Sequence, residues 1–329
     1  MTIYFKNVYF NASATVVGPY EKNGPLKEYF DSSYKDLHLG EKTWEIAERK
    51  FLEKSVDILL NKLNLTRFDI DLFISGDLLN QIVSSSYTAS FLGIPYLGIY
   101  SACATSAESL IVASSFVDKK QVKNCICATS SHNASAEKQF RYPTEYGSPK
   151  PKISTFTATG GACCFLSNKK DKIKIESGTI GRVVDLGIKD AFNMGAAMAP
   201  AAANTIFTHL DETKRDISYY DLIVTGDLGI YGKKILTEYM SSEYNIRLKN
   251  YEDCGLLLYD IDKQPVYAGG SGPVCSALVL YSYLISLMKK KRYKKILFVA
   301  TGALFSKDMV SQKETIPGIA HAVSLEVVE

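Results

Sequence analysis

Residues 69–78 read DIDLFISGDL, and residues 219–228 read YYDLIVTGDL. Both stretches place Asp-Leu before a short apolar run, and both close that run with Gly-Asp-Leu. The two equivalent aspartates, Asp77 and Asp227, lie 150 residues apart. This spacing is too long for the unit of a solenoid and indicates a duplicated domain. We therefore expect two similar halves, residues 1–172 and residues 173–329.

The similarity continues downstream of both turns. Residues 105–130 (TSAESLIVASSFVDKKQVKNCICATS) and 275–302 (CSALVLYSYLISLMKKKRYKKILFVATG) share one plan. Each contains Ser-Ala, an apolar helix, a basic loop and a buried strand that ends in Ala-Thr. Apolar runs typical of strands recur between helical stretches, at residues 70–75, 94–100, 126–129, 222–225 and 296–300. Such strands belong in an α/β sheet that helices cover on both faces.

The composition is that of an ordinary globular protein. The chain has 329 residues, of which 46% are hydrophobic, and its formal charge of +3 gives no argument for nucleic acid as a partner. Seven cysteines without a recognisable signal peptide predict reduced thiols, and their spacing predicts no metal site. The most apolar helical stretch, residues 274–288, is shorter than the roughly 20 residues that span a bilayer. We therefore expect a soluble protein without a transmembrane helix.

A candidate pocket is predicted around Cys103, in the stretch YSACATSAESL at residues 100–110. In open α/β sheets, ligands bind beyond the carboxyl ends of the strands, where Asp77, Cys103, His132 and Asp227 all fall. Simpler roles remain open for each of them. Cys103 could only pack in a tight turn, the two aspartates could be helix N-caps, and His132 could be structural.

Several longer stretches resemble one known family. The sequence ATSSHNASAEKQFRYPTEYG at residues 128–147 is long and unusual, and ISGDLLNQ, SACATSAES, AGGSG and KETIPGIAH accompany it. Together they resemble the stage V sporulation protein AD family of spore-forming bacteria, which has a thiolase-like fold. That fold implies duplicated βαβαβαββ halves in a five-layered αβαβα arrangement.

The resemblance also implies a function. Proteins of this family are non-catalytic and bind dipicolinic acid (pyridine-2,6-dicarboxylate), free or as its calcium chelate. They act with membrane-embedded subunits of a transport complex that loads dipicolinate into developing spores, and they are associated with spore germination. The implied location is peripheral, at the inner spore membrane. The implied assembly is a homodimer, because the thiolase fold pairs open sheet edges.

An enzyme is the alternative interpretation, namely a thiolase or ketoacyl synthase that uses Cys103 for acyl transfer. A condensing enzyme needs a base and donors for the developing oxyanion. Compared with ketoacyl synthases, this chain has Gly226 where a histidine is expected and Gly270 where an asparagine is expected. We therefore expect no enzymatic activity and no cofactor. His321, in the final glycine-containing turn, could still stand close to Cys103.

Two further features allow alternatives. Arg141 could bind a carboxylate of the ligand, or it could anchor its own loop by an ion pair with Glu137 or Glu145. The basic run KKKRYKK at residues 289–295 could be a solvated loop after a helix, or it could attract anionic lipid head groups. The predicted ligand-binding residues are Asp77, Cys103, His132, Asp227 and His321.

Overall fold

The computed structural model describes residues 1–141 and 150–328, with the backbone alone for Arg141. In the first half, the strand order is β5-β4-β6-β8-β2, and only β8 runs antiparallel to its neighbours. These strands are β2 (Tyr9–Val17), β4 (Leu72–Gly76), β5 (Tyr96–Gly98), β6 (Asn124–Ser131) and β8 (Gly160–Ser167).

The second half repeats this topology. Its strand order is β11-β10-β13-β14-β9, and β14 is the strand that runs antiparallel to both neighbours. The duplication that the two Gly-Asp-Leu stretches predict is therefore confirmed at the level of strand order and direction. The strands are β9 (Ile173–Thr179), β10 (Leu222–Thr225), β11 (Tyr251–Asp253), β13 (Lys295–Ala303) and β14 (Gly318–Val327).

The strands of the two halves are joined at one edge, where β2 meets β9, and so belong to one continuous sheet. A single pair, Tyr9 with Lys174, joins β2 to β9 and so links the two five-stranded units. Short strands extend this sheet, since β1 (Thr2–Tyr4) pairs with β9 and β3 (Ser32–Ser33) pairs with β2. The expected boundary between residues 172 and 173 falls directly before β9.

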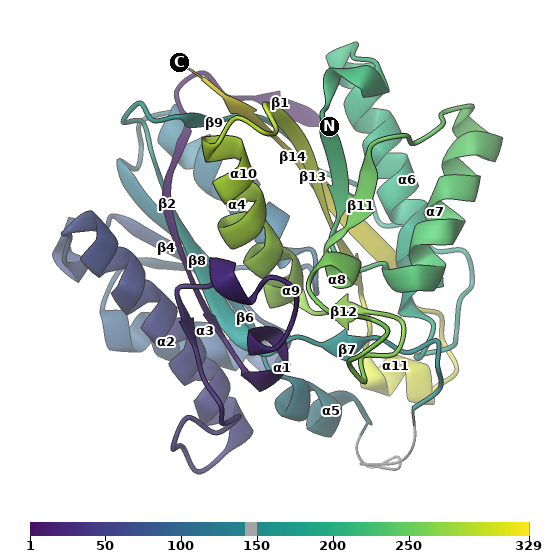
Figure 1. Ribbon diagram of the computed structural model, residues 1–329, viewed down its shortest axis with the longest axis horizontal. Helices are drawn as coiled ribbons and strands as arrows, with labels where there is room; N and C mark the ends of the chain where they lie inside the picture. Colours follow the sequence, from purple (N-terminus) through teal and green to yellow (C-terminus); the bar gives the residue numbers. More distant parts are fainter. Residues whose placement is uncertain (142–149, 329) are drawn as a thin grey trace.

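Helices form three layers around the two sheet units (Figure 1). The outer helices of the first half are α2 (Trp44–Leu63) and α3 (Val83–Leu92), and those of the second half are α6 (Met194–Thr213) and α7 (Gly229–Tyr244). The central layer contains α4 (Thr105–Asp118), α9 (Pro273–Leu278) and α10 (Ile285–Lys289). The result is the expected five-layered αβαβα arrangement.

The central helices explain the most apolar stretch of the sequence. Residues 274–288 form α9, a π-helical turn (Val279–Leu284) and α10, and most of their side chains are buried between the two sheet units. The hydrophobic run thus fills the core between the two halves. Among the described residues, no helix combines the length and the hydrophobicity needed to cross a membrane.

The parallel strands bring the predicted pocket residues to one end of the molecule. Asp77 follows β4, Asp227 follows β10, and the Cys103 turn connects β5 to α4. The loops that precede β6 and β13, which carry the basic runs, lie at the opposite end. The fold therefore separates the candidate site from the most basic segments of the chain.

Candidate functional site

The Cys103 turn fits into a space that two glycines leave open. A Cβ atom on Gly76 would lie 2.1 Å from the carbonyl oxygen of Ile99, and one on Gly302 would lie 2.4 Å from that of Ser101. Ala102 has a positive φ of 49°, a conformation that costs energy for a residue with a side chain. A tight turn held in this way directs the Cys103 side chain away from α4 and toward the second half of the chain.

Cys103 contacts polar groups that come from the second half. Its sulphur lies 3.9 Å from the hydroxyl oxygen of Ser271, in β12 (Gly270–Ser271). The Ser271 hydroxyl in turn donates to Asp227 Oδ2 at 3.0 Å. The Asp227 carboxylate also accepts from the Thr301 hydroxyl at 2.8 Å and from the Gly272 N–H at 3.1 Å. Cys103 and Asp227, predicted from separate motifs, are therefore neighbours.

This environment keeps the Cys103 sulphur protonated. Burial raises the pKa of the thiol well above its usual value, and the negative charge of Asp227 raises it further. Burial also raises the pKa of Asp227, to about 6, so that its carboxyl group is mostly ionised at neutral pH. A thiol beside a carboxylate is a weak nucleophile, because the thiolate is the reactive form.

His321 is close to the turn but is held by other groups. Its Nε2 atom lies 3.3 Å from the hydroxyl oxygen of Ser101, and its Nδ1 atom accepts from the Gly181 N–H at 3.2 Å. Because Nδ1 is an acceptor, the neutral ring carries its proton on Nε2 and donates to Ser101. Burial lowers the pKa of His321 to about 4. The imidazole is therefore neutral at physiological pH and supplies no positive charge to stabilise a thiolate.

Asp77 is fully buried and acts as a cap. Its carboxylate accepts from the Leu79 N–H at 3.0 Å and from the Ser85 N–H at 2.8 Å, in the first turn of α3. Its equivalent, Asp227, does not cap α7; Asp253 accepts from the N–H groups of Leu228 and Gly229 instead. The capping interpretation thus fits the Asp77 geometry, and Asp77 shapes the wall beside Cys103.

A buried glutamate that the sequence analysis did not single out lies behind Asp77. Glu48 accepts from the hydroxyls of Ser130 at 3.1 Å and Ser135 at 2.7 Å. Burial, followed by the charge of Asp77, raises the pKa of Glu48 to about 8. The signal in the sequence was weak: Glu48 falls among apolar residues on the buried side of α2, but so do Glu53 and Ser55.

His132 turns away from the Cys103 turn. Its Nε2 atom donates to the carbonyl oxygen of Leu37 at 2.9 Å, and its Nδ1 atom accepts from the Ala134 N–H at 3.1 Å. The ring is buried against Phe51 of α2. The structure therefore does not bring His132 to the other predicted site residues, and the structural role fits its contacts.

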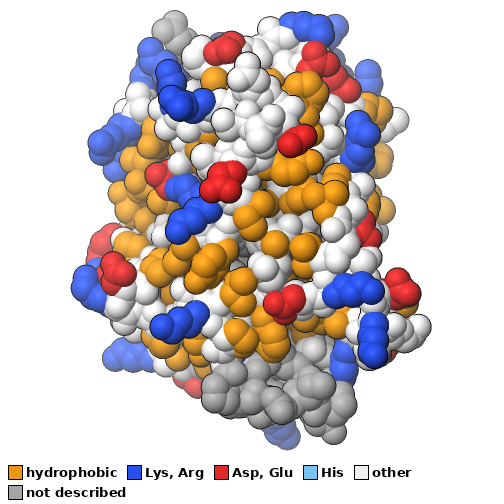
Figure 2. All heavy atoms as spheres, turned by 90° about the vertical axis from the view of Figure 1, so that its right-hand side faces the viewer, with side chains coloured by type: hydrophobic (Ala, Val, Ile, Leu, Met, Phe, Trp, Pro, Cys, Tyr) orange, Lys and Arg blue, Asp and Glu red, His pale blue; other side chains and the backbone are white. Residues whose placement is uncertain are grey.

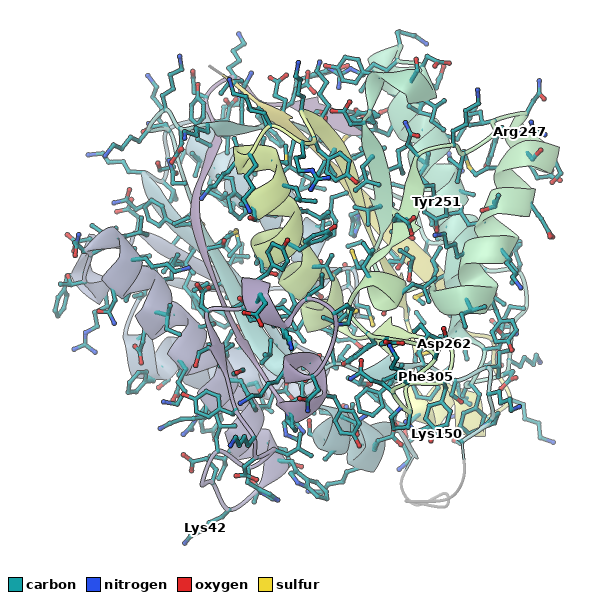
Figure 3. The ribbon with its side chains drawn as sticks, in the orientation of Figure 1. Lys42, Lys150, Arg247, Tyr251, Asp262 and Phe305 are labelled. Atoms are coloured by element: carbon teal, nitrogen blue, oxygen red, sulfur yellow. The ribbon has the colours of Figure 1, made fainter. Side chains whose placement is uncertain are left out.

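A cleft of about 700 Å³ opens beside the Cys103 turn. Cys103 packs with Leu78 and Ala102, and Phe140 and Leu304 cover this cluster from the cleft side. The ring of Phe140 meets that of Phe305 edge to face, with centroids 5.5 Å apart. Figure 3 shows Phe305 at the lower end of the molecule, above Lys150. The lining residues are Leu78–Ile82, Gly98–Tyr100, Gln139, Phe140 and Leu304–Asp308.

One wall of this cleft has a strained backbone. Gln81 and Ile82 both have positive φ values, 57° and 48°. For a β-branched residue such as Ile82 this conformation is unusual, and it persists only where the surroundings hold it. The N–H groups of Leu79 and Ser85, which donate to the Asp77 carboxylate, lie on either side of this segment in the sequence. Asp77 thus helps to hold the strained segment in place, together with Leu78, which packs against Cys103.

Part of the predicted site lies outside the described residues. This holds for the side chain of Arg141 and for all of Glu145, so neither predicted role of Arg141 has a structural counterpart here. Glu137 does form an ion pair, with Lys150. The sequence does not reveal Ser271 and Thr301 as site residues. Their hydroxyls donate to Asp227 only because distant turns meet in the fold.

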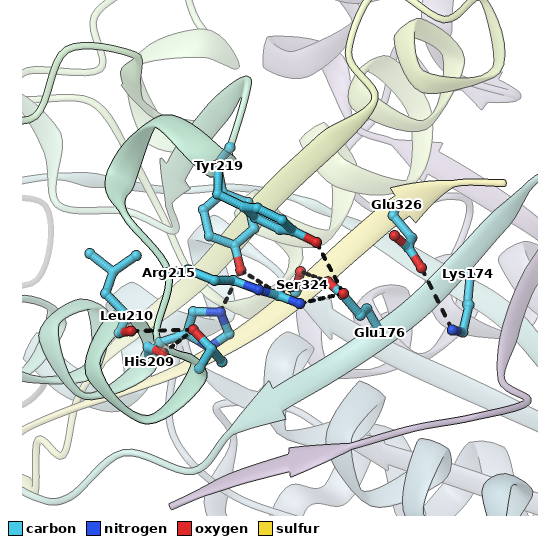
Figure 4. Close-up of polar contacts among 10 residues, drawn as sticks. Lys174, Glu176, His209, Leu210, Arg215, Tyr219, Ser324 and Glu326 are labelled. Atoms are coloured by element: carbon cyan, nitrogen blue, oxygen red, sulfur yellow. Dashed lines mark hydrogen bonds and ion pairs between the residues drawn. The ribbon is translucent and has the colours of Figure 1, made fainter.

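A second polar cluster is distant from the cleft and has a structural role (Figure 4). Arg215 forms an ion pair with Glu176, and Glu176 also accepts from the hydroxyls of Tyr219 and Ser324. His209 lies between the hydroxyls of Thr179 and Tyr220, and burial lowers its pKa to about 4. The groups satisfy one another and join α6 to the sheet.

The chain is similar in sequence to sporulation proteins. The family described as Stage V sporulation protein AD matches residues 1–326. Stage V sporulation protein AD of Bacillus subtilis (strain 168) is 48% identical over 320 residues, which cover 97% of this chain and 94% of that protein.

Two solved structures with the same fold illustrate the similarity in architecture. The 3-oxoacyl-[acyl-carrier-protein] synthase III of Aquifex aeolicus is 14% identical, with a TM-score of 0.59 over 97% of this chain and 99% of that one. A point variant of OleA from Xanthomonas campestris is 13% identical, with a TM-score of 0.64 over 98% of each chain. At these identities the similarity shows the fold alone.

Proposed function

The chain belongs to the stage V sporulation protein AD family, and we propose that it is a non-catalytic subunit that binds dipicolinic acid. In this proposal it works within a transport assembly that loads dipicolinate into developing spores and that takes part in spore germination. Membrane-embedded subunits of that assembly are its partners, and its location is peripheral, at the inner spore membrane. Family membership supports the role in sporulation. The proposed ligand and partners are those that the resemblance to this family implies.

The single observation that carries the non-catalytic part is the environment of Cys103. Its thiol faces the Asp227 carboxylate, and the nearest histidine, His321, is neutral because burial lowers its pKa to about 4. A condensing enzyme needs a thiolate and a base at this place. Gly226 and Gly270 supply no side chain that could take over either task.

The cleft beside Cys103 suits a small planar ligand. Phe140, Leu304 and Phe305 offer apolar surface to the faces of a pyridine ring. Gln139, Tyr100 and Ser306 offer hydrogen-bonding groups at the rim, and Lys307 carries a positive charge that suits a carboxylate. At about 700 Å³ the cleft is larger than one dipicolinate, so it also has room for a hydrated calcium chelate.

A homodimer is part of the proposal. β5 is the edge strand of the first half, and it leaves one side of its backbone unpaired. Tyr87 and Phe91 of α3 and Leu97 of β5 are exposed beside that edge. Exposed aromatic side chains next to an open sheet edge favour pairing with a second copy.

Light scattering tests the proposed dimer. At micromolar concentration it is expected to give twice the 36.4 kDa mass of one chain; the mass of a single chain would contradict the dimer.

Calorimetric titration of the purified protein tests the proposed ligand. We expect pyridine-2,6-dicarboxylate to bind with one site per chain, and the 3,5-isomer to bind at least tenfold more weakly because its carboxylates point elsewhere. Titrations with calcium and with a chelator present decide whether the metal enters with the ligand. Equal binding of both isomers, or none, would contradict the proposal.

The enzyme alternative has one supporting observation, the condensing enzymes among the proteins of the same fold. A covalent acyl group on Cys103 after incubation with acetoacetyl-coenzyme A would favour it. The raised pKa of the thiol predicts that no such adduct forms at neutral pH.

A further inference from the structure

Three loops and the N-terminal segment gather lysines at the end of the molecule that lies opposite the cleft. The loops, given with the last residue of the helix before them, are residues 118–123 at the end of α4 and residues 289–294 at the end of α10; the third is residues 168–172 between β8 and β9. We call the exposed cations of these segments the basic end: Lys6, Lys119, Lys120, Lys123, Lys169, Lys170, Lys172, Lys289, Lys290, Lys291, Arg292 and Lys294.

Backbone contacts hold these segments next to one another. The N–H groups of Lys6 and Asn7 donate to Asp118, and Asn124 pairs with Ser167 between β6 and β8. The last strand bridges the other two loops, because Val327 N–H donates to the Lys294 carbonyl and Val328 N–H donates to the Lys172 carbonyl. The lysines therefore form one surface, although they come from four parts of the sequence. It lies at the end that carries both termini, at the top of Figure 1.

The carboxylates nearby are too few to neutralise this surface, and their hydrogen bonds go to backbone groups. Asp71 accepts from the backbone N–H groups of Lys123 and Asn124, and Asp221 accepts from those of Lys294 and Lys295. Asp118 and Asp171 bind backbone N–H groups in the same way. Among the ion pairs between described residues, none includes a cation of the basic end.

The charge of the protein is thus unevenly distributed. The twelve cations of the basic end against these four aspartates give a formal charge of +8, whereas the whole chain carries +3, so the rest of the molecule is net acidic. On the face that carries α7, hydrophobic side chains occupy much of the middle, and basic and acidic side chains are interspersed over the rest (Figure 2). Unpaired like charges on one surface repel each other, and a surface of opposite charge relieves that repulsion.

We propose that the basic end binds the anionic surface of a lipid bilayer. Eleven of its twelve cations are lysines, whose compact charge attracts anionic head groups without needing a defined geometry. Nucleic-acid sites usually depend on arginine and on exposed aromatic residues, and the only aromatic residue in the three loops is the half-buried Tyr293. In this orientation the cleft beside Cys103 faces away from the bilayer. The inference rests on the peripheral location proposed above, and it does not require dipicolinate binding.

Vesicle co-sedimentation tests this surface. The probes are vesicles of phosphatidylcholine alone and vesicles that also contain about 30% phosphatidylglycerol, an anionic lipid. We expect the wild type to sediment with the anionic vesicles only, and to be released when the salt concentration rises from about 0.05 M to about 0.5 M. Wild-type protein that ignores anionic vesicles at low salt would overturn the inference.

Two triple variants with the same net charge localise the effect. The test variant carries Lys169→Glu, Lys170→Glu and Lys291→Glu, all exposed and all in the basic end. The control carries Lys42→Glu, Lys152→Glu and Lys189→Glu, which are exposed and lie outside it; Lys42 is at the bottom of Figure 3. Because each lysine near an anionic surface contributes roughly fivefold to partitioning, and each exchange also adds a repelled carboxylate, the test variant is expected to lose at least about a hundredfold. The control is expected to stay within about threefold of the wild type.

Further results test whether the basic end is the binding surface and whether lipid is its partner. An equal loss in both triple variants would mean that net charge alone acts, and would remove the basic end as the binding surface. A short DNA duplex that binds the wild type as tightly as the vesicles would overturn lipid as the partner. Dipicolinate titration of the test variant is expected to match the wild type. Vesicle binding by a wild type that binds no dipicolinate would leave this inference standing and contradict only the proposed ligand.

Discussion

The hydroxyl oxygen of Ser271, from the second half of the chain, lies 3.9 Å from the sulphur of Cys103, from the first half. The same hydroxyl donates to Asp227 at 3.0 Å, so the thiol is part of a polar contact that spans the duplication. In an enzyme of this fold, the second half would supply groups that activate a cysteine. Here it supplies a carboxylate, whose negative charge opposes ionisation of the thiol, and a serine that bridges the carboxylate and the sulphur.

The reactivity of Cys103 tests this electrostatic effect. We expect its alkylation by iodoacetamide to be slow at pH 7, and Asp227→Asn to shift the pH at which it becomes fast to a lower value, because the negative charge that opposes ionisation is removed. Peptide mass spectrometry separates Cys103 from the other buried cysteines. An unchanged pH profile in the variant would mean that Asp227 does not control the thiol.

The two predicted histidines are expected to behave differently. His321→Ala should weaken dipicolinate binding at least fivefold, because Ser101 at the start of the Cys103 turn loses its partner. His132→Ala should lower the free energy of unfolding by about 1–3 kcal/mol and leave the affinity within about twofold, because its partners are Leu37 and Ala134. Calorimetric titration and urea unfolding of both variants measure the two effects. Equal losses of affinity would contradict the separation.

Asp77 is expected to act on binding through the wall of the cleft. Asp77→Asn keeps one oxygen acceptor and loses the other, so either the Leu79 or the Ser85 N–H becomes unsatisfied. We expect a loss of about 1–3 kcal/mol in unfolding free energy together with weaker binding. Ser324→Ala, which removes a buried hydrogen bond to Glu176 in the polar cluster of Figure 4, is the matched control and should lose stability only. Asp77→Asn with full stability and weak binding would instead indicate direct contact with the ligand.

Glu21 predicts a pH dependence of stability. It is fully buried, its Oε1 atom accepts from Tyr259 and from the Thr159 N–H, and its Oε2 atom has no partner among the described residues. Burial raises its pKa to about 7. Because the folded state binds this proton more tightly than the unfolded state, stability is full below pH 4.5 and falls as the pH rises to about 7, by up to about 3 kcal/mol.

The amide variant removes this titration. Glu21→Gln keeps the acceptor and cannot ionise, so it should be more stable than the wild type at pH 8, with a flatter profile between pH 5 and pH 8. Thermal unfolding across this pH range is the measurement. Glu48, whose pKa is raised from 4.5 to about 8, contributes a slope over that whole range and remains in both proteins. Parallel profiles of wild type and variant would contradict the assignment.

The fold could be predicted well because its main signals are local and repeated. Apolar runs placed β4, β6, β10 and β13 within about three residues at either end, and the Gly-Asp-Leu repeat revealed two halves with the same strand order. The side chains that follow each strand were harder to predict. Asp77 and Asp227 occupy equivalent positions, but α3 begins at Val83 and α7 begins at Gly229, so the first carboxylate caps its helix and the second is free to meet Ser271.

The rest of the site depends on contacts between distant segments. Ser271 and Thr301 meet Asp227 only because β10, β13 and the β12 turn converge in space. His132 follows a strand end, as expected of a pocket residue, but a carbonyl from residue 37 turns its ring toward α2. The spacing of residues within one strand or helix carries no information about such partners.

The most direct test of the central claim is dipicolinate titration of a variant in which the cleft is filled. Leu304 is half-buried, lines the cleft and packs over Cys103, so Leu304→Trp should block the site without entering the core. Ile246→Trp, in a hollow of about 550 Å³ between α6 and the segment that follows α7, is the matched control. The account predicts that Leu304→Trp loses at least tenfold in affinity while Ile246→Trp binds like the wild type, both unfolding at the wild-type temperature. Wild-type affinity in a folded Leu304→Trp protein would contradict a ligand site beside Cys103.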